Sequence, residues 1–218
     1  MTFLNAVFDL DGTLADSMAT WRNNELDALE AVTGIRITPE DREVLSVNTF
    51  NDAICKAAEK YGVEHYDFAA VTEEAHRLMT VSYKQADMPL KPYVKEFLTY
   101  IRSRGGKTAV ATATPRVMVM PYLERMGVVP LLDAVLSVHE EKCDSKGKSA
   151  EIFERAMNAI GGTKENTVVF EDAYHAIVNA KKAGFTVYAV PDAKQANAKE
   201  IRKIADRFLT SFADVMED

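Results

Sequence analysis

From residue 89 onward, short apolar runs alternate with longer amphipathic segments. This alternation constrains the fold strongly, because strands that alternate with helices form right-handed βαβ units and a parallel sheet. The apolar runs predict strands at 107–112, 134–138, 167–170 and 186–190, with a short last strand at 207–209. The segments between them predict helices at 92–104, 116–126, 150–160, 174–183 and 195–205. The sequence therefore predicts an α/β fold.

The N-terminal run FLNAVFDL, Phe3–Leu10, predicts a further buried strand of the same sheet. The stretch that follows, up to residue 84, is polar, lacks a strong strand, and is divided by glycine and proline into about four predicted helices. We interpret it as a helical cap inserted after the first strand. The predicted α/β core comprises residues 1–15 and 86–218, and the predicted cap comprises residues 16–85.

Composition excludes several classes of protein. The net charge is −7 and no block of lysine and arginine occurs, which argues against nucleic acid or an anionic membrane as partner. No run of about 18 apolar residues is present, and the N-terminus lacks the basic flank and apolar region of a signal peptide. The two cysteines, Cys55 and Cys143, form no disulfide framework. We expect a cytoplasmic protein and a monomer, although the sequence does not settle the oligomeric state.

Residues suited to phosphate and metal chemistry gather where the predicted strands end. Ligands of parallel α/β sheets bind beyond the carboxyl ends of the strands, so residues at these ends share one rim. The segment Asp9-Leu10-Asp11-Gly12-Thr13 follows the first strand, Thr112 ends the second, Lys146 and Lys148 precede the helix at 150–160, and Glu171-Asp172 follows the strand at 167–170.

The four carboxylates on this rim, Asp9, Asp11, Glu171 and Asp172, would repel one another without a counter-charge. Oxygen ligands of this kind suit Mg²⁺, and a hydroxyl and a lysine beside them can hold the remaining phosphate oxygens. A carboxylate with an ordinary pKa of about 4 is ionised at neutral pH and can attack phosphorus directly, forming an aspartyl-phosphate. A second carboxyl two residues later can protonate the leaving group and then activate water.

Each of these signals has a plainer interpretation when it is taken alone. Asp11-Gly12 is a common turn sequence, Glu171-Asp172 can cap the following helix, and Thr112 and the two lysines can be ordinary strand-end and solvated residues. Their order along the chain and their shared rim favour a site over this set of coincidences.

The same residues resemble the motifs of the haloacid dehalogenase superfamily. The segment 8–17, FDLDGTLADS, resembles the first motif, Thr112 in VATAT the second, Lys148 in GKSAEIF the third, and VFEDA at 169–173 the fourth. The resemblance covers essentially the whole chain, and its first motif is highly specific.

This resemblance implies a Rossmann-like core with a helical cap after the first strand. It implies that Asp9 is the nucleophile and Asp11 the general acid and base. It also implies Mg²⁺ held by Asp9, the backbone carbonyl of Asp11 and Asp172, with Glu171 close by. Dehalogenases of the superfamily lack the second aspartate, so Asp11 favours phosphoryl chemistry.

The third motif departs from the family pattern, which usually continues Lys-Pro-x-Pro-Asp. Here Lys148-Ser149-Ala150-Glu151 is one residue shorter before Ile152-Phe153, which leaves Lys146 as a rival for the lysine that binds phosphate. We prefer Lys148, together with Thr112, as the substrate-binding pair.

The expected function is Mg²⁺-dependent hydrolysis of a small phosphorylated metabolite, a phosphomonoester. The alternative is a sugar-phosphate mutase of the β-phosphoglucomutase type, and a third hypothesis is a member of the family without catalysis. A mutase needs a cationic anchor in the cap, but Trp21 and Phe50 stand where the mutase pattern carries histidine and arginine. Arg22 and Arg42 are nearby and remain possible substitutes.

Overall fold

The computed structural model describes residues 4–46, 48–85, 88–192 and 197–216. They form two compact units. The α/β unit holds residues 4–16, 89–192 and 197–216, and the helical unit holds residues 17–46, 48–85 and 88, against the predicted 16–85. None of the helices in these ranges is long and apolar enough to cross a membrane.

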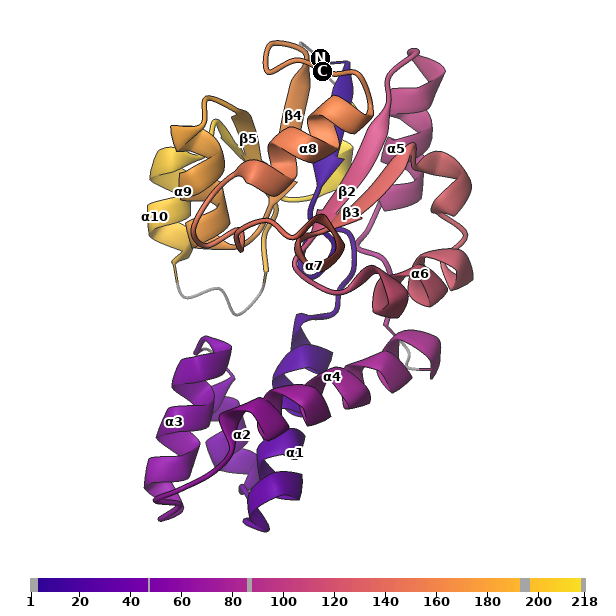
Figure 1. Cartoon of the computed structure of the whole chain (residues 1–218). Helices are drawn as coiled ribbons and strands as arrows, with labels where there is room; N and C mark the ends of the chain where they lie inside the picture. The colour runs from indigo at the N-terminus through magenta and orange to yellow at the C-terminus, as the bar shows by residue number, and fades with distance from the viewer. Residues whose placement is uncertain (1–3, 47, 86–87, 193–196, 217–218) are drawn as a thin grey trace. The chain divides into compact units, whose positions relative to one another are not determined.

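The sheet of the α/β unit has six strands in the described residues, all parallel, in the order β3-β2-β1-β4-β5-β6 (Figure 1). The strands are β1 (Asn5–Phe8), β2 (Thr108–Thr112), β3 (Ala134–Ser137), β4 (Thr167–Glu171), β5 (Thr186–Ala189) and β6 (Arg207–Phe208). The chain order reverses at β1, so the gap between β1 and β4 is the topological switch point at which such sheets bind ligands. The predicted Rossmann-like parallel sheet is confirmed.

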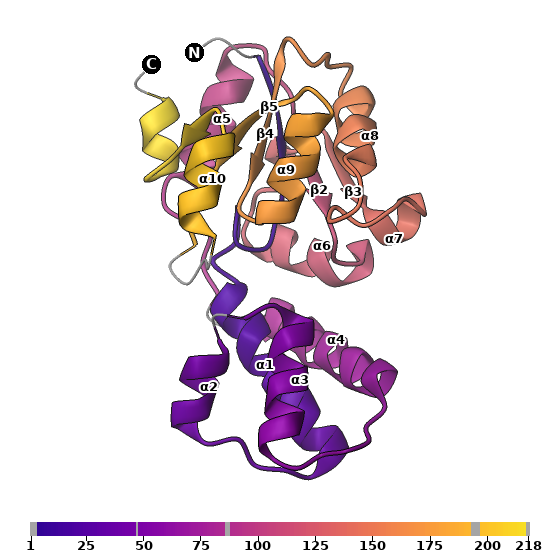
Figure 2. The same ribbon diagram turned by 90° about the vertical axis from the view of Figure 1, so that its left-hand side faces the viewer.

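The helices of this unit cover both faces of the sheet (Figure 2). They are α5 (Val94–Ser103), α6 (Arg116–Arg125), α7 (Val138–Glu141), α8 (Glu151–Ala159), α9 (Tyr174–Lys182) and α10 (Ala198–Ile204), with short 3₁₀ helices at Val129–Leu131 and Phe212–Val215. The α-helices other than α7 were predicted within a few residues, whereas α7 and the two 3₁₀ helices were not predicted. The start predicted for the last helix, at 195, lies outside the described residues, as does Phe3 of the predicted first strand.

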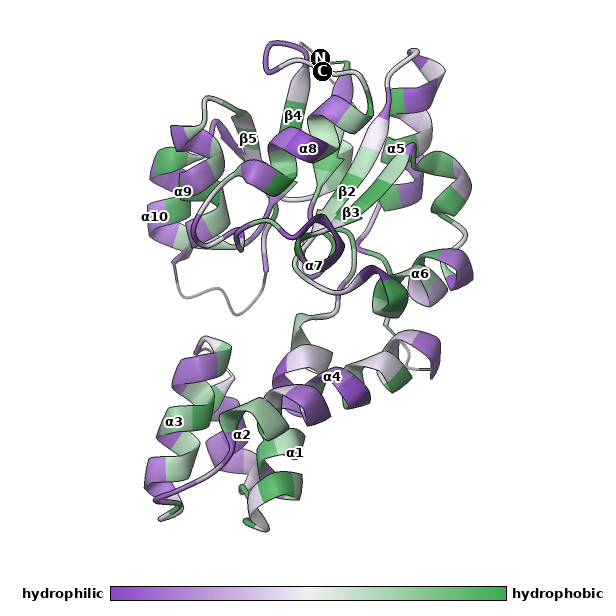
Figure 3. Ribbon diagram, viewed as in Figure 1, coloured by the Kyte–Doolittle hydropathy of each residue, from purple (hydrophilic) through white to green (hydrophobic). Residues whose placement is uncertain are grey.

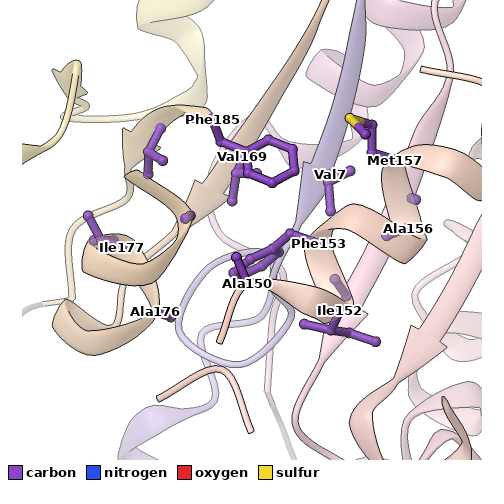
Figure 4. Packing of buried hydrophobic residues seen from close by; sticks show 14 of the residues in the cluster. Val7, Ala150, Ile152, Phe153, Ala156, Met157, Val169, Ala176, Ile177 and Phe185 are labelled. Carbon is purple, nitrogen blue, oxygen red and sulfur yellow. The ribbon is translucent and has the colours of Figure 1, made fainter. Parts of the chain in front are cut away.

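The buried strands alternate their side chains between two apolar layers. Val7 and Val169 point to one face, where Phe153 of α8 and Ile177 of α9 pack against them (Figure 4). The next residue of each strand, Phe8 and Phe170, points to the other face, and their rings stack with centroids 4.8 Å apart. The central strands are therefore buried on both sides, which explains their continuous apolar runs (Figure 3).

The helical unit is built from four helices of the described residues, α1 (Met18–Thr33), α2 (Pro39–Leu45), α3 (Phe50–Lys60) and α4 (Phe68–Gln85). Threonine caps begin α2 and α3: Thr38 accepts from the N–H of Asp41, and Thr49 accepts from that of Asp52. A separate apolar core, with Leu26, Leu29, Ile54 and Val71 among its buried members, holds the unit together. A helical insertion after the first strand is thus confirmed.

Tyr93, at the start of α5, has a strained backbone. Its φ is +65°, in the left-handed region where a side chain with a Cβ costs roughly 1–2 kcal/mol, and the residue is 51% exposed. Glycine adopts this conformation without that cost.

We therefore expect Tyr93→Gly to raise the free energy of unfolding by about 1 kcal/mol. Urea denaturation of both proteins measures it. The matched control is Tyr100→Gly, the same change inside helix α5, which should lower the free energy of unfolding by about 1 kcal/mol or more. Equal destabilisation by both substitutions would show that the backbone of Tyr93 carries no relievable strain.

Candidate active site

The loop after β1 places the first two acidic residues. Asp9 continues the strand pairing, since its N–H donates to the carbonyl of Phe170 over 2.9 Å. The chain then turns tightly around the carbonyl of Leu10, which accepts from the N–H groups of Leu14 at 2.9 Å and Ala15 at 2.8 Å. The side chain of Asp9 is buried, because β1 lies in the middle of the sheet.

Gly12 lets this loop approach the loop that follows β4. Its φ is +88°, and a Cβ built on it would lie 2.4 Å from Oδ2 of Asp172. The neighbouring Thr13 donates its hydroxyl to Oδ1 of Asp172 over 2.9 Å. The motif residues Gly12 and Thr13 therefore fix the position of the Asp172 carboxylate, 160 residues further along the chain.

Three buried carboxylates meet at the switch point between β1 and β4. One oxygen each of Asp9, Glu171 and Asp172 lies within 4.8 Å of the others. The ammonium of Lys146 bridges Oδ1 of Asp9 and Oε2 of Glu171, the latter at 2.8 Å. The other oxygen of Glu171 accepts from the N–H groups of Asp172 and Ala173 at 3.2 and 3.0 Å, which holds the loop after β4. We call these four residues, Asp9, Lys146, Glu171 and Asp172, the acidic cluster.

The electrostatics of the acidic cluster favour a cation. Burial and then the charge of Glu171 raise the pKa of Asp9 well above its ordinary value, and the same two causes raise the pKa of Asp172 to about 7. Burial alone would lower the pKa of Lys146, but the charges of Asp9 and Glu171 raise it above its ordinary value, so it stays protonated. When all three carboxylates are ionised, the cluster carries two uncompensated negative charges. A divalent ion with oxygen ligands fits this donor set.

Asp11 lies outside the three-carboxylate group. One of its carboxylate oxygens accepts the hydroxyl of Thr114 over 2.9 Å. The N–H of Thr114 in turn donates to the hydroxyl oxygen of Thr112 over 3.0 Å. Thr114 was not predicted from the sequence, although it stands two residues after Thr112 and directly before Pro115, the N-cap residue of α6.

Comparison with known proteins assigns the chain to a family. The family model described as haloacid dehalogenase-like hydrolase matches residues 6–190, which is most of the chain. The chain belongs to this family. The predicted resemblance to these hydrolases is confirmed, and so is the expectation of an enzyme.

Named relatives of this haloacid dehalogenase-like hydrolase include phosphatases. The chain is 24% identical to pyrophosphatase PpaX from Halalkalibacterium halodurans over 84% of this chain and 81% of that protein. It is 23% identical to hexitol phosphatase B from Escherichia coli over 97% and 94% of the two chains. The solved structure of a β-phosphoglucomutase from Clostridium difficile has the same fold, with a TM-score of 0.71, 19% identity, and coverage of 98% and 93%.

The structure places the two lysines of this hydrolase in different environments. Lys146 is buried in the acidic cluster, and its backbone carbonyl accepts from the side-chain amide of Asn179 over 2.9 Å. Lys148 is exposed. Thr112 lies buried at the carboxyl end of β2, next to β1, as predicted from its place in the sequence. Among the described residues, no side-chain hydrogen bond or ion pair joins Lys148 to the acidic cluster, so the choice of Lys146 over Lys148 is a proposal.

Proposed function

We propose that this hydrolase is a Mg²⁺-dependent phosphatase that acts on a small phosphomonoester through an aspartyl-phosphate on Asp9. The observation that carries the proposal is the contrast between two aspartates. Asp9 is buried in the acidic cluster and held by Lys146, whereas Asp11 lies outside the cluster and is held by Thr114. The two aspartates thus have different surroundings and suit different roles.

The metal would be held by Asp9, Asp172 and the backbone carbonyl of Asp11. Glu171 would hold Lys146 and, through the N–H of Ala173, the loop after β4. When bound, Mg²⁺ neutralises the buried carboxylates and the phosphate oxygens, so that an anionic nucleophile and an anionic substrate can approach each other. Lys146 adds a fixed positive charge beside Asp9, which could contact a phosphate oxygen. The hydroxyl of Thr112 accepts from Thr114 and keeps its own proton to donate to phosphate.

In the first half-reaction a carboxylate oxygen of Asp9 forms a bond to phosphorus while the bond from phosphorus to the leaving oxygen breaks. The leaving oxygen takes the electron pair and receives a proton from the Asp11 carboxyl. In the second half-reaction Asp11 takes a proton from water, which attacks phosphorus and releases Asp9 and inorganic phosphate. Thr114 holds the Asp11 carboxyl through both steps.

The helical unit favours hydrolysis over mutase activity. Trp21 packs edge-on against the rings of His76 and Tyr83, and Phe50 packs against Phe68, so neither position offers a cation. Arg42, a substitute anchor on sequence grounds, is bound to Asp27 at 2.7 Å and to Glu30 at 3.1 Å. A mutase must hold a second phosphate while the first transfers, and the contacts of Trp21, Phe50 and Arg42 supply no cationic anchor for it. Arg22 stays an open substitute.

The test of this function follows two products. With 4-nitrophenyl phosphate, Mg²⁺ should give release of nitrophenol and EDTA should prevent it. With β-glucose 1-phosphate and a trace of the 1,6-bisphosphate, inorganic phosphate should form faster than glucose 6-phosphate. Faster formation of glucose 6-phosphate would replace the phosphatase proposal by the mutase, and turnover unaffected by EDTA would remove the metal from it.

We also expect the affinity for Mg²⁺ to rise with pH. Since the pKa of Asp172 is raised to about 7 and that of Asp9 is raised as well, protons compete with the metal at pH 6 and not at pH 8. Titration calorimetry should show binding about tenfold tighter at pH 8, with protons released at pH 6. Lys146 is protonated at both pH values, so it does not contribute to the change of Mg²⁺ affinity with pH. Equal affinity at the two pH values would contradict the raised pKa values of Asp9 and Asp172.

The same pKa shifts fix the sign of the stability change in EDTA. Without metal, the folded protein holds protons on Asp9 and Asp172 at pH values where the unfolded chain has released them. The free energy of unfolding in EDTA should therefore fall as pH rises from about 4 through 7, and Mg²⁺ should restore it.

A cytoplasmic location, a monomeric state and the absence of nucleic-acid or membrane partners stay predictions.

A further inference from the structure

Two segments of the α/β unit, 10–16 and 89–91, form a small paired structure beneath Asp11. Ala15 bridges Leu90 in antiparallel fashion. The N–H of Asp16 donates to the carbonyl of Pro89 over 3.0 Å, and the N–H of Lys91 donates to the carbonyl of Leu14 over 2.8 Å. We call this the paired segments.

Hydrogen bonds with Ala15, in the paired segments, hold the backbone on both sides of Asp11. The N–H of Gly12, which follows Asp11, donates to the carbonyl of Ala15 over 3.0 Å. The N–H of Ala15 donates to the carbonyl of Leu10, which precedes Asp11, over 2.8 Å. Any displacement of Ala15 must therefore move the loop that carries Asp11.

One side chain of α6 reaches the paired segments from outside. The hydroxyl of Tyr122 donates to the carbonyl of Pro89 over 3.1 Å, beside the N–H of Asp16 that uses the same acceptor. Tyr122 is fully buried. Burial and the nearby charges of Asp11 and Asp16 raise the pKa of its hydroxyl above the ordinary value, so the hydroxyl remains a donor. Thr114, two residues before the start of α6, donates directly to the carboxylate of Asp11.

We propose that Tyr122 is a positioning residue that fixes Asp11 by holding Pro89, Asp16 and Ala15 in the paired segments. The proposal rests on the proposed function, in which Asp11 protonates the leaving oxygen. The hydroxyl of Tyr122 contacts the backbone of the paired segments, at the carbonyl of Pro89. Tyr122 acts on the orientation of the Asp11 side chain. Thr114 holds the carboxylate of Asp11, and the paired segments hold the backbone on either side of it.

A comparison of two leaving groups tests this role. Nitrophenolate departs with little help from a proton, whereas phenolate, with a pKa close to that of tyrosine at about 10, departs faster when an acid protonates it. Phenyl phosphate and 4-nitrophenyl phosphate share one ring, so binding differs little between them. The value of kcat/KM reports steps up to cleavage of the ester bond, and the ratio of the two values does not depend on the folded fraction of a preparation.

We expect Tyr122→Phe to lower kcat/KM about tenfold for phenyl phosphate and less than about twofold for 4-nitrophenyl phosphate. The matched control is Thr108→Val, which also removes a buried hydroxyl that donates to a backbone carbonyl, that of Leu131, at the opposite end of the sheet. This control should change both substrates by the same factor.

Equal losses for the two esters in Tyr122→Phe, or no loss in either, would overturn the positioning role. So would the same selective loss in Thr108→Val. Failure of the proposed function is separately visible, because Asp9→Asn measured beside these variants would then retain turnover of 4-nitrophenyl phosphate, and the role of Tyr122 would fall with it.

Discussion

Asp9→Asn should abolish phosphatase turnover, with kcat lower by about 10⁴ or more. The amide has nearly the shape of the carboxylate but cannot donate an electron pair to phosphorus as an anion, and it also removes one charge from the metal site. Acid-quenched wild-type enzyme should carry a phosphoryl group that Asp9→Asn lacks, and intact-protein mass spectrometry measures it.

The fold of Asp9→Asn should be intact. Burial and the charge of Glu171 disfavour the ionised form of Asp9, so the neutral amide should not lower the free energy of unfolding in metal-free buffer at pH 8. Asp144→Asn, an exposed change in the loop that leads to Lys146, is the matched control and should keep wild-type activity. Substantial turnover by pure, folded Asp9→Asn protein would exclude covalent catalysis by Asp9.

Lys146→Met should be the second most damaging change, with kcat/KM lower by about 10²–10³. It removes the ammonium that contacts Asp9 and Glu171 and leaves both carboxylates buried without that partner. The loss of a partner from a buried ion pair should also lower the free energy of unfolding by about 3 kcal/mol.

Lys148→Met is the matched control, two residues away and exposed, and should stay within about twofold of wild type. Lys146→Arg keeps the positive charge and separates loss of charge from loss of geometry. Circular dichroism in saturating Mg²⁺ shows whether each variant is folded. A larger loss in Lys148→Met than in Lys146→Met would return Lys148 to the phosphate-binding role that its sequence position first suggested.

The spacing of the third motif did not decide between these lysines, for a structural reason. The chain between α7 and α8 turns at Ser145, whose carbonyl accepts from the N–H groups of Lys148 at 2.8 Å and Ser149 at 3.1 Å. Within this turn Lys146 is buried and Lys148 is exposed. A count of residues along the sequence contains no information about which side chain a loop of different length buries.

The sheet was predictable because its central strands are buried on both faces. The run TAVAT at 108–112 is buried at every position and carries no charged residue, which is typical of a central parallel strand. Helix α7 was missed because four residues, VHEE, show no periodicity. The bond from Thr114 to Asp11 joins positions 103 residues apart, and neither residue carries a local signal of the contact.

The antiparallel pairing of Ala15 with Leu90 has a consequence for how this protein can be altered. Because the chain leaves the α/β unit at one member of a bonded pair and returns at the other, the helical unit is an insertion whose two ends meet. The gap between Asp16 and Pro89 has the geometry of an open hairpin, which a two-residue Asn-Gly turn can close. The acidic cluster and Asp11 all lie in the α/β unit, so foreign inserts grafted at this one junction would leave these residues in place.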